Sequence, residues 1–379
     1  MKNISFNDPA TNVSSFYNLL KLKKYNHFSS NGKFTKQCEQ WLRDNIKCKE
    51  ALLVHSCTAA LEMCAILLNI KKDDEVIMPS YTFVSTANAF VLRGGTPVFV
   101  DIDSETLNID PNKIEKVITK KTKAIVVVHY AGISCDMDPI LNIAKKYKLY
   151  VIEDAAQAIL SSYKGRPLGS IGDLATLSFH ESKNIHCGEG GALLINNKKF
   201  LRRAKIIRDK GTNRDDFNNN IVKKYTWIDL GSSYGLSEIN AAFLYGQLKQ
   251  AKKIITKRLA IFNYYHKLLE NLEIKKLIKR PTIPTYAKVN GHMYYILVKN
   301  NKRDKLIKYL KQKKINTVFH YVPLHSSHFG KLKAIIKTIM KNTNYASNNL
   351  LRLPLHTKLI NKDVSICCKN IYSFFKNKK

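Results

Sequence analysis

The sequence lacks several features that would assign it to a class at once. None of its eight cysteines forms a Cys-x-x-Cys pair. Glycine and proline number only 16 and 10 in 379 residues, and acidic residues are much fewer than basic ones. No apolar run approaches the roughly 20 residues that a bilayer crossing needs. We therefore expect no metal site, no disulfide scaffold, no low-complexity chain and no membrane span. The first ten residues are polar and lack the apolar core of a signal peptide, so we expect a cytoplasmic protein with reduced thiols.

The excess of positive charge raises the hypothesis of a nucleic-acid-binding protein. The chain has 63 Lys+Arg against 29 Asp+Glu, a formal charge of +34, and a basic chain attracts phosphates. However, only 11 of the basic residues are arginine, the side chain best suited to bidentate contacts with bases and phosphates. The lysines are also spread along the whole chain. A general drift in amino-acid usage explains the many lysines at least as well as nucleic-acid binding does. We therefore favour an enzyme that binds neither nucleic acid nor membrane.

The apolar content, 45%, is sufficient for a large core and is arranged in two patterns. Seven short apolar runs are typical of buried strands: 51–55, 75–78, 97–101, 124–128, 149–152, 175–179 and 192–195. Helix-like stretches separate them, which predicts an α/β domain with a large, mostly parallel sheet. After residue 235 a long helical region, 237–272, precedes a strand (294–298), a helix (303–314) and a strand (316–322). We predict a large α/β domain over 1–245, which includes an N-terminal segment, and a small α+β domain over 246–379.

Asp154 follows one of the predicted strands. The carboxyl end of a buried parallel strand is where ligands bind in open α/β sheets, and a carboxylate there is costly unless a positive group pairs with it. Asp is also a common N-cap residue, and on this segment alone a cap is the better interpretation.

Two further segments could act together with Asp154. Lys183 lies between a predicted strand and the glycine-rich turn 187–191; it is either an ordinary solvated charge or an amine that condenses with an aldehyde cofactor. Residues 56–60 lie between a strand and a helix and are either a plain cap or a phosphate site. Pyridoxal phosphate (PLP) needs all three elements: a lysine for its aldehyde, a carboxylate for its ring nitrogen and a site for its phosphate. Their order around one sheet favours this cofactor.

With these residues identified, the chain resembles the DegT/StrS family of sugar aminotransferases. The segments that carry the resemblance run in the family's order: 74–90, 128–132, 151–157, 178–183, 224–234 and 318–325. The resemblance implies the PLP-dependent transferase fold (aspartate-aminotransferase-like, fold type I). It also implies transfer of an amino group from L-glutamate to carbon four of dTDP-4-dehydro-6-deoxy-D-glucose. The products would be dTDP-4-amino-4,6-dideoxy-D-galactose and 2-oxoglutarate, for a surface polysaccharide such as enterobacterial common antigen or O-antigen. A sugar 3-aminotransferase and a UDP-sugar aminotransferase of the same family remain alternatives.

The resemblance also implies roles for individual residues. Lys183 matches the catalytic lysine that forms the Schiff base, Asp154 the acid at the pyridinium nitrogen, and Gln157 the residue against the ring near its hydroxyl. The other positions that match cofactor-binding residues, or lie close enough to line the site, are Thr58, Ala59, Phe83, Ser178 and His180. Phe83 could equally be a core residue of an apolar segment, and His180 a satisfied core histidine.

Two features concern the substrate side and a partner subunit. Tyr321 and His325 match a segment that contributes to the sugar site, and the family implies a homodimer with the active site at the interface. Many members carry Gly-x-Asn-Tyr-Arg where this chain has Gly-Ser-Ser-Tyr-Gly, so that Ser233 replaces the asparagine that reaches the neighbour's cofactor phosphate. Ser233 can still donate one hydrogen bond. The turn at 187–191 is also one residue shorter than in the members of the family that act on this dTDP-linked sugar.

Overall fold

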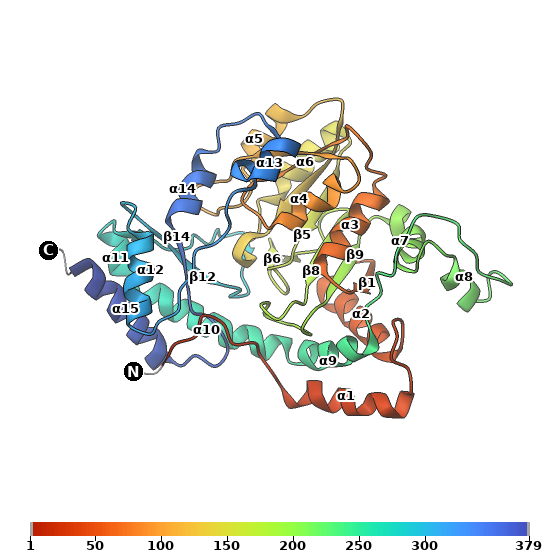
Figure 1. Ribbon diagram of the computed structural model, residues 1–379, viewed down its shortest axis with the longest axis horizontal. Coiled ribbons are helices and arrows are strands. Elements are labelled where there is room, and N and C mark those ends of the chain that lie inside the picture. Colours follow the sequence, from red (N-terminus) through yellow and green to blue (C-terminus); the bar gives the residue numbers. More distant parts are fainter. Residues whose placement is uncertain (1–2, 377–379) are drawn as a thin grey trace.

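An eight-stranded sheet forms the centre of the computed structural model, which describes residues 3–376 (Figure 1). The order of its strands is β1-β9-β8-β5-β4-β2-β3-β13. They are β1 (Glu50–Val54), β2 (Glu75–Pro79), β3 (Thr96–Val100), β4 (Thr122–Val128), β5 (Tyr150–Asp154), β8 (Leu174–Ser178), β9 (Gly191–Ile195) and β13 (Ile335–Ile336). Only β9 runs against its neighbours, β1 and β8. The seven strands predicted between residues 50 and 195 are therefore confirmed, each within two residues of its predicted bounds.

Helices cover both faces of this sheet, which explains why its strands are apolar along their whole length. One face packs against α3 (Cys57–Leu67), α4 (Val84–Val91) and α7 (Leu201–Arg208). The other packs against α2 (Lys33–Ile46), α6 (Met137–Tyr147) and α9 (Glu238–Lys249). The carboxyl ends of the parallel strands β2, β4, β5 and β8 consequently meet at one edge of the sheet, where loops rather than helices follow.

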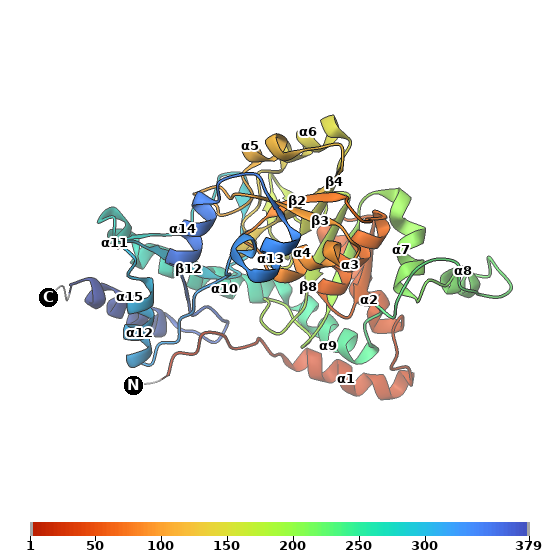
Figure 2. The same ribbon diagram turned by 45° about the horizontal axis from the view of Figure 1, so that its top comes forward.

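A second, three-stranded sheet lies at the other end of the molecule (Figures 1 and 2). Its strands are β10 (Ile278–Lys279), β12 (Tyr294–Val298) and β14 (Leu350–Leu353), and it packs with α10 (Ala251–Leu268), α12 (Arg303–Gln312) and α15 (Asn361–Lys376). The remaining elements are α1 (Val13–Tyr25), α5 (Pro111–Ile114), α8 (Arg214–Asn218), α11 (Glu270–Ile274), α13 (His328–Lys333), α14 (Lys341–Asn349), β6 (Ser162–Tyr163), β7 (Arg166–Pro167) and β11 (Ala287–Lys288). A division of the chain into domains near residue 245 stays a prediction.

Two sequence predictions for this region need correction. The helical region 237–272 is not continuous: Gln250 has φ −100° and ψ 4°, and it separates α9, which packs on the large sheet, from α10, which reaches the second core. The strand predicted over 316–322 is wrong, because only Val318 forms a bridge, to Arg352. Residues 319–322 include apolar side chains that suggested a strand, but they line a cavity and do not pair with a sheet.

The N-terminal segment joins the two ends of the molecule. Ile4 forms a parallel bridge with Ile315, through hydrogen bonds of 2.9 Å to Lys314 O and 3.0 Å from Asn316 N. The chain then runs to α1, which packs against α9 (Figure 1). Within residues 3–376 no helix is both long enough and apolar enough to span a bilayer.

Candidate active site

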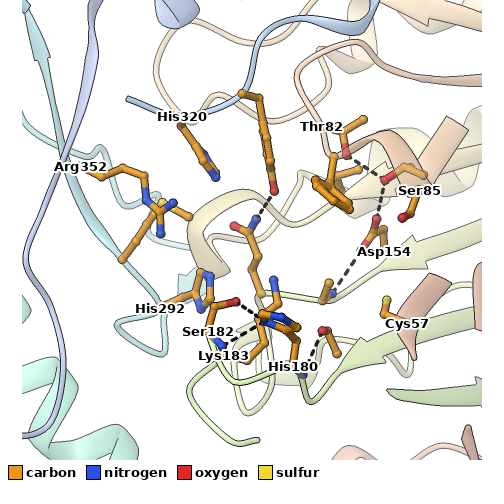
Figure 3. A pocket seen from close by; sticks show the side chains of 18 of the residues that line it. Cys57, Thr82, Ser85, Asp154, His180, Ser182, Lys183, His292, His320 and Arg352 are labelled. Atoms are coloured by element: carbon orange, nitrogen blue, oxygen red, sulfur yellow. Dashed lines mark hydrogen bonds between the residues drawn. The ribbon is translucent and has the colours of Figure 1, made fainter. Parts of the chain in front are cut away.

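A cavity of 740 Å³ opens where the carboxyl edge of the large sheet faces β12 and β14 (Figure 3). Eight of the eleven residues that the sequence singled out line it: Thr58, Phe83, Asp154, Gln157, Ser178, His180, Lys183 and Tyr321. These residues are far apart in the sequence, from Thr58 to Tyr321, so it is the fold that brings them together.

Asp154 is the last residue of β5, and its side chain is buried at the cavity wall. Its Oδ2 accepts a hydrogen bond of 2.7 Å from Thr86 Oγ1, and its Oδ1 accepts one of 3.2 Å from Ala156 N. No basic side chain within residues 3–376 lies within salt-bridge distance of this carboxylate. A buried carboxylate with only neutral donors is suited to accept a proton-bearing nitrogen from a ligand.

Lys183 follows β8 and points into the same cavity (Figure 3). Burial is the main cause that lowers the pKa of its amine below the ordinary value for lysine. The acidic groups of Cys57 and Asp154 partly oppose this effect, and the positive charge of Arg352 adds to it. A lowered pKa increases the neutral fraction of the amine, which is the form that acts as a nucleophile and as a base.

The N-terminus of α3 forms another part of the wall. Ser56 Oγ accepts a 3.0 Å hydrogen bond from Ala59 N, so the Ala59 amide already has a partner, and Ala59 does not line the cavity. The backbone N–H groups of Cys57 and Thr58 are in the first turn of the helix, where N–H groups have no acceptor within the helix. Thr58 Oγ1 lies 2.8 Å from Ser85 Oγ, which belongs to the first turn of α4. Two helix N-termini with hydroxyl groups thus converge where an anion would be stabilised.

Aromatic and amide side chains flank the space between Lys183 and Asp154. Gln157 is fixed at both ends: its Nε2 donates to Tyr321 Oη at 2.8 Å, and its Oε1 accepts from Ala131 N at 2.7 Å. The Phe83 ring is 56% exposed and its centroid lies 6.3 Å from that of Tyr321. An exposed aromatic face next to a cavity is available for stacking on a planar ligand.

His180 lies at the mouth of the cavity. Its Nδ1 accepts from Ser182 N at 3.1 Å and lies 2.9 Å from Ser182 Oγ, while its Nε2 is 3.5 Å from Glu189 Oε1. It is therefore not the satisfied core histidine that the sequence left as an alternative.

Ser233 and His325 are not at the cavity. Ser233 bridges Asp209 in the backbone. The His325 imidazole spans Ser80 Oγ at 2.7 Å and Asn344 Oδ1 at 3.1 Å, which ties the loop after β2 to α14. Their roles, like those of the other predicted site residues, stay predictions.

Sequence reasoning missed several residues of the wall. They are Thr86, which supports Asp154, and a group on the side of the second sheet: Arg258, His292, His320 and Arg352. Arg352 carried a signal that could have been used, because a charged residue interrupts the apolar run 350–353.

The polar groups of the cavity fit the three polar ends of PLP. A half-buried lysine amine, a carboxylate whose donors are neutral and two helix N-termini face one space. An aldehyde, a protonated ring nitrogen and a phosphate require these groups.

Comparison with known proteins also supports an aminotransferase, and the similarity extends over nearly the whole chain. Residues 12–372 match the DegT/DnrJ/EryC1/StrS aminotransferase family. An uncharacterised protein of Methanocaldococcus jannaschii is 40% identical over 341 residues, 88% of each chain. An aminotransferase of Streptococcus pneumoniae, solved in PLP and PMP forms, is 25% identical over 99% of each chain, with TM-scores of 0.90 and 0.91. Helicobacter pylori PseC, an aminotransferase involved in the biosynthesis of pseudoaminic acid, is 25% identical over 99% of this chain and 100% of its own, with a TM-score of 0.90.

Proposed function

Because the chain belongs to the DegT/DnrJ/EryC1/StrS aminotransferase family and is a PLP-dependent sugar aminotransferase, we propose a specific reaction for it. We propose that it transfers the amino group of L-glutamate to carbon four of dTDP-4-dehydro-6-deoxy-D-glucose. The observation that carries the transaminase chemistry is the convergence of Lys183, Asp154 and the α3 N-terminus on one cavity. The choice of sugar rests on the six segments that carry the family resemblance, including 74–90 and 318–325, which contribute to the cavity wall.

We propose that the cofactor is held at three places by this chain's own residues. The amides of Cys57 and Thr58 and the hydroxyls of Thr58, Ser85 and Ser178 would bind its phosphate. Asp154 would accept the ring N–H, and Phe83 and Gln157 would fix the ring plane. When bound, PLP supplies an electron-withdrawing ring that stabilises negative charge on the carbon next to the transferred nitrogen.

Lys183 and Asp154 would share the proton chemistry. As a neutral amine, Lys183 Nζ can take a proton from the α-carbon of the amino donor and return it on the other side of the transferred nitrogen. The Asp154 carboxylate would accept a hydrogen bond from the protonated ring nitrogen, which would let the ring accept negative charge. Thr86 Oγ1 donates to Asp154 Oδ2 and so fixes the carboxylate in its orientation without neutralising it.

The charges around the cavity support an anionic sugar substrate. The chain has a net charge of +34 and Arg258 lines the cavity, whereas the acidic residues in its wall are Asp154 and the exposed Glu189. A nucleotide-linked sugar carries a diphosphate, and a positively charged cavity raises its local concentration.

A homodimer forms part of the proposal. Large apolar side chains are exposed on α1 and on the arm around α8 that extends from the body in Figure 1: Val13, Phe16, Tyr17, Leu20, Phe217, Ile221, Tyr225, Trp227, Ile228 and Leu230. Exposed apolar surface of this extent is typical of an interface. We expect sedimentation velocity at micromolar concentration to show a dimer. Trp227→Ser, which truncates a side chain that is 78% exposed, should increase the monomer fraction. A wild-type protein that sediments as a monomer would contradict the proposal.

Product analysis tests the reaction. The purified protein, loaded with PLP, is incubated with L-glutamate and a dTDP- or UDP-linked 4-keto or 3-keto deoxyhexose, and the sugar product is identified by NMR. We expect amination of the dTDP-linked 4-keto sugar at carbon four with release of 2-oxoglutarate. Amination at carbon three, or of the UDP sugar only, would replace our substrate with one of the two alternatives. Strong, salt-dependent binding of DNA by a preparation that aminates no sugar would refute the proposed reaction.

A further inference from the structure

Arg352 is a cation at the cavity wall that has no anionic partner. It lies on β14, where its backbone N donates to Val318 O at 2.8 Å. Among the described residues its buried Nε has no hydrogen-bond partner, and no carboxylate lies within salt-bridge distance of its guanidinium. An arginine whose donors are left unused next to a cavity is costly in the free protein and is suited to bind an anion from outside.

The surroundings of Arg352 hold it in place without neutralising it. Its guanidinium lies over the Phe6 ring, 4.7 Å from the centroid, so that one face is covered by the N-terminal segment. Nearby Arg258 donates to Gly291 O at 3.0 Å and to His292 O at 2.7 Å, which uses its donors on the backbone. It thereby adds a second positive charge to this side of the cavity.

The two histidines on this side do not add further positive charge that could compete with Arg352 for an anion. Burial and the charges of Lys183 and Arg352 place the pKa values of His292 and His320 well below the ordinary value, so both are neutral at pH 7. His292 Nδ1 lies 3.1 Å from Asn184 Oδ1, and His320 Nδ1 lies 2.6 Å from Tyr130 Oη. The free guanidinium of Arg352 is therefore the group on this side with unused donors and a full charge.

The position of Arg352 relative to Lys183 indicates which anion it meets. In Figure 3, Arg352 and His292 lie on one side of Lys183, while Asp154 and the α3 residue Cys57 lie on the other. The phosphate site at α3 is thus on the far side of the lysine. In an α-amino acid the carboxylate is bonded to the same carbon as the amine that reacts near Lys183, so its binding group must lie close to the lysine and away from the phosphate site. Arginine presents two parallel N–H donors that match a carboxylate.

We propose that Arg352 binds the α-carboxylate of the amino donor and so selects α-amino acids, a proposal that rests on the transaminase function above. Phe6 positions the guanidinium by covering one of its faces. The nucleotide sugar, which reacts after the donor has left, does not require this contact.

Half-reactions measured separately test the proposal. We would compare wild type with Arg352→Gln and Arg352→Lys, following the change in cofactor absorbance by stopped flow with L-glutamate and with 4-aminobutyrate, which lacks the α-carboxylate. Arg352→Gln should raise the KM for L-glutamate by about 10- to 100-fold, the range expected for lost hydrogen bonds to a charged group, with a smaller fall in kcat. The preference for L-glutamate over 4-aminobutyrate should collapse, and Arg352→Lys should be intermediate. Titration calorimetry with succinate, a non-reacting dicarboxylate, should show the same loss of affinity.

The second half-reaction and a remote variant serve as controls. The PMP-loaded variants should aminate the nucleotide sugar within about three-fold of wild type, and Arg202→Gln, at an exposed side chain on α7, should behave as wild type throughout. Unchanged kinetics with L-glutamate in Arg352→Gln would overturn the proposal. So would a selective loss in the sugar half-reaction, which would assign Arg352 to the diphosphate. If wild type reacts with no α-amino acid, the proposed function fails, and the two failures are thereby distinguished.

Discussion

Lys183→Met is expected to lower turnover by about 10³-fold or more while leaving the fold intact. General acid–base catalysis alone contributes about 10²–10⁴-fold, and Lys183 is also the group to which we assign covalent capture of the cofactor. Methionine keeps most of the unbranched side chain but has no amine. Borohydride reduction of the loaded wild type followed by mass spectrometry should locate the cofactor on Lys183, and the variant should retain none covalently.

The same variant is expected to raise the melting temperature of the protein without cofactor at pH 7. Burial lowers the pKa of Lys183 in the folded state, whereas an unfolded lysine has a pKa of about 10.4. Between these two values the unfolded chain binds more protons, so the stability of the wild type rises with pH. The penalty is therefore greatest below the folded-state pKa, and the difference between variant and wild type should shrink towards pH 10.

Lys308→Met is the matched control for both measurements. Lys308 is exposed on α12, so its replacement should change neither turnover nor the pH dependence of melting. A Lys183→Met protein that still turns over at a wild-type rate would exclude Lys183 as the catalytic lysine. Equal melting temperatures of Lys183→Met and wild type at every pH would show that the amine is not destabilising.

Asp154→Asn is expected to lower kcat by about 10²–10⁴-fold with little change in melting temperature. The substitution keeps the shape of the side chain and an oxygen that can accept from Thr86, but it removes the negative charge that keeps the ring nitrogen protonated. Steady-state kinetics with saturating L-glutamate and sugar would measure the loss.

Thr86→Val tests whether catalysis depends on the charge of Asp154 or on the hydrogen bond that orients its carboxylate. It removes the 2.7 Å hydrogen bond to Oδ2 but leaves the carboxyl group of Asp154 in place, so we expect a loss of only about 10-fold. If Asp154→Asn lost no more than Thr86→Val, the charge would not be what the site uses.

The sequence predicted the large sheet well because its signal is local. A buried strand such as β4 is a continuous apolar run that can be recognised without knowing its neighbours. The failures arose where tertiary contacts decide the outcome. Gln250 looks helical, yet the helix is interrupted there, and α10 continues from the core that contains α9 into the second core. Residues 316–322 have the pattern of a strand, but only Val318 forms a bridge, and residues 319–322 line a cavity.

The residues of the candidate site also fall into two groups, those that local sequence indicates and those that only tertiary contacts bring to the site. Lys183 and Asp154 could be found from the sequence because each follows a recognisable strand, and the family pattern supplied their roles. Arg352 stands out because it interrupts the apolar run 350–353, but the sequence could not place it next to Phe6, because nothing local indicates that residues 346 positions apart lie in contact. Thr86 was likewise invisible, since its hydroxyl is 68 positions from the carboxylate that it supports.

The bridge between Ile4 and Ile315 and the contact of Phe6 with Arg352 determine when, during its synthesis, the protein can become active. Chains emerge from the ribosome with the N-terminus first, and domains tend to fold as they emerge. The large sheet is complete, apart from the short edge strand β13, once β9 has been made, but the segment around Phe6 must then wait for β14, near the other end of the chain. The wall opposite the cofactor is therefore closed only after β14 has been translated, so the proposed binding site for the amino donor forms later than the large sheet.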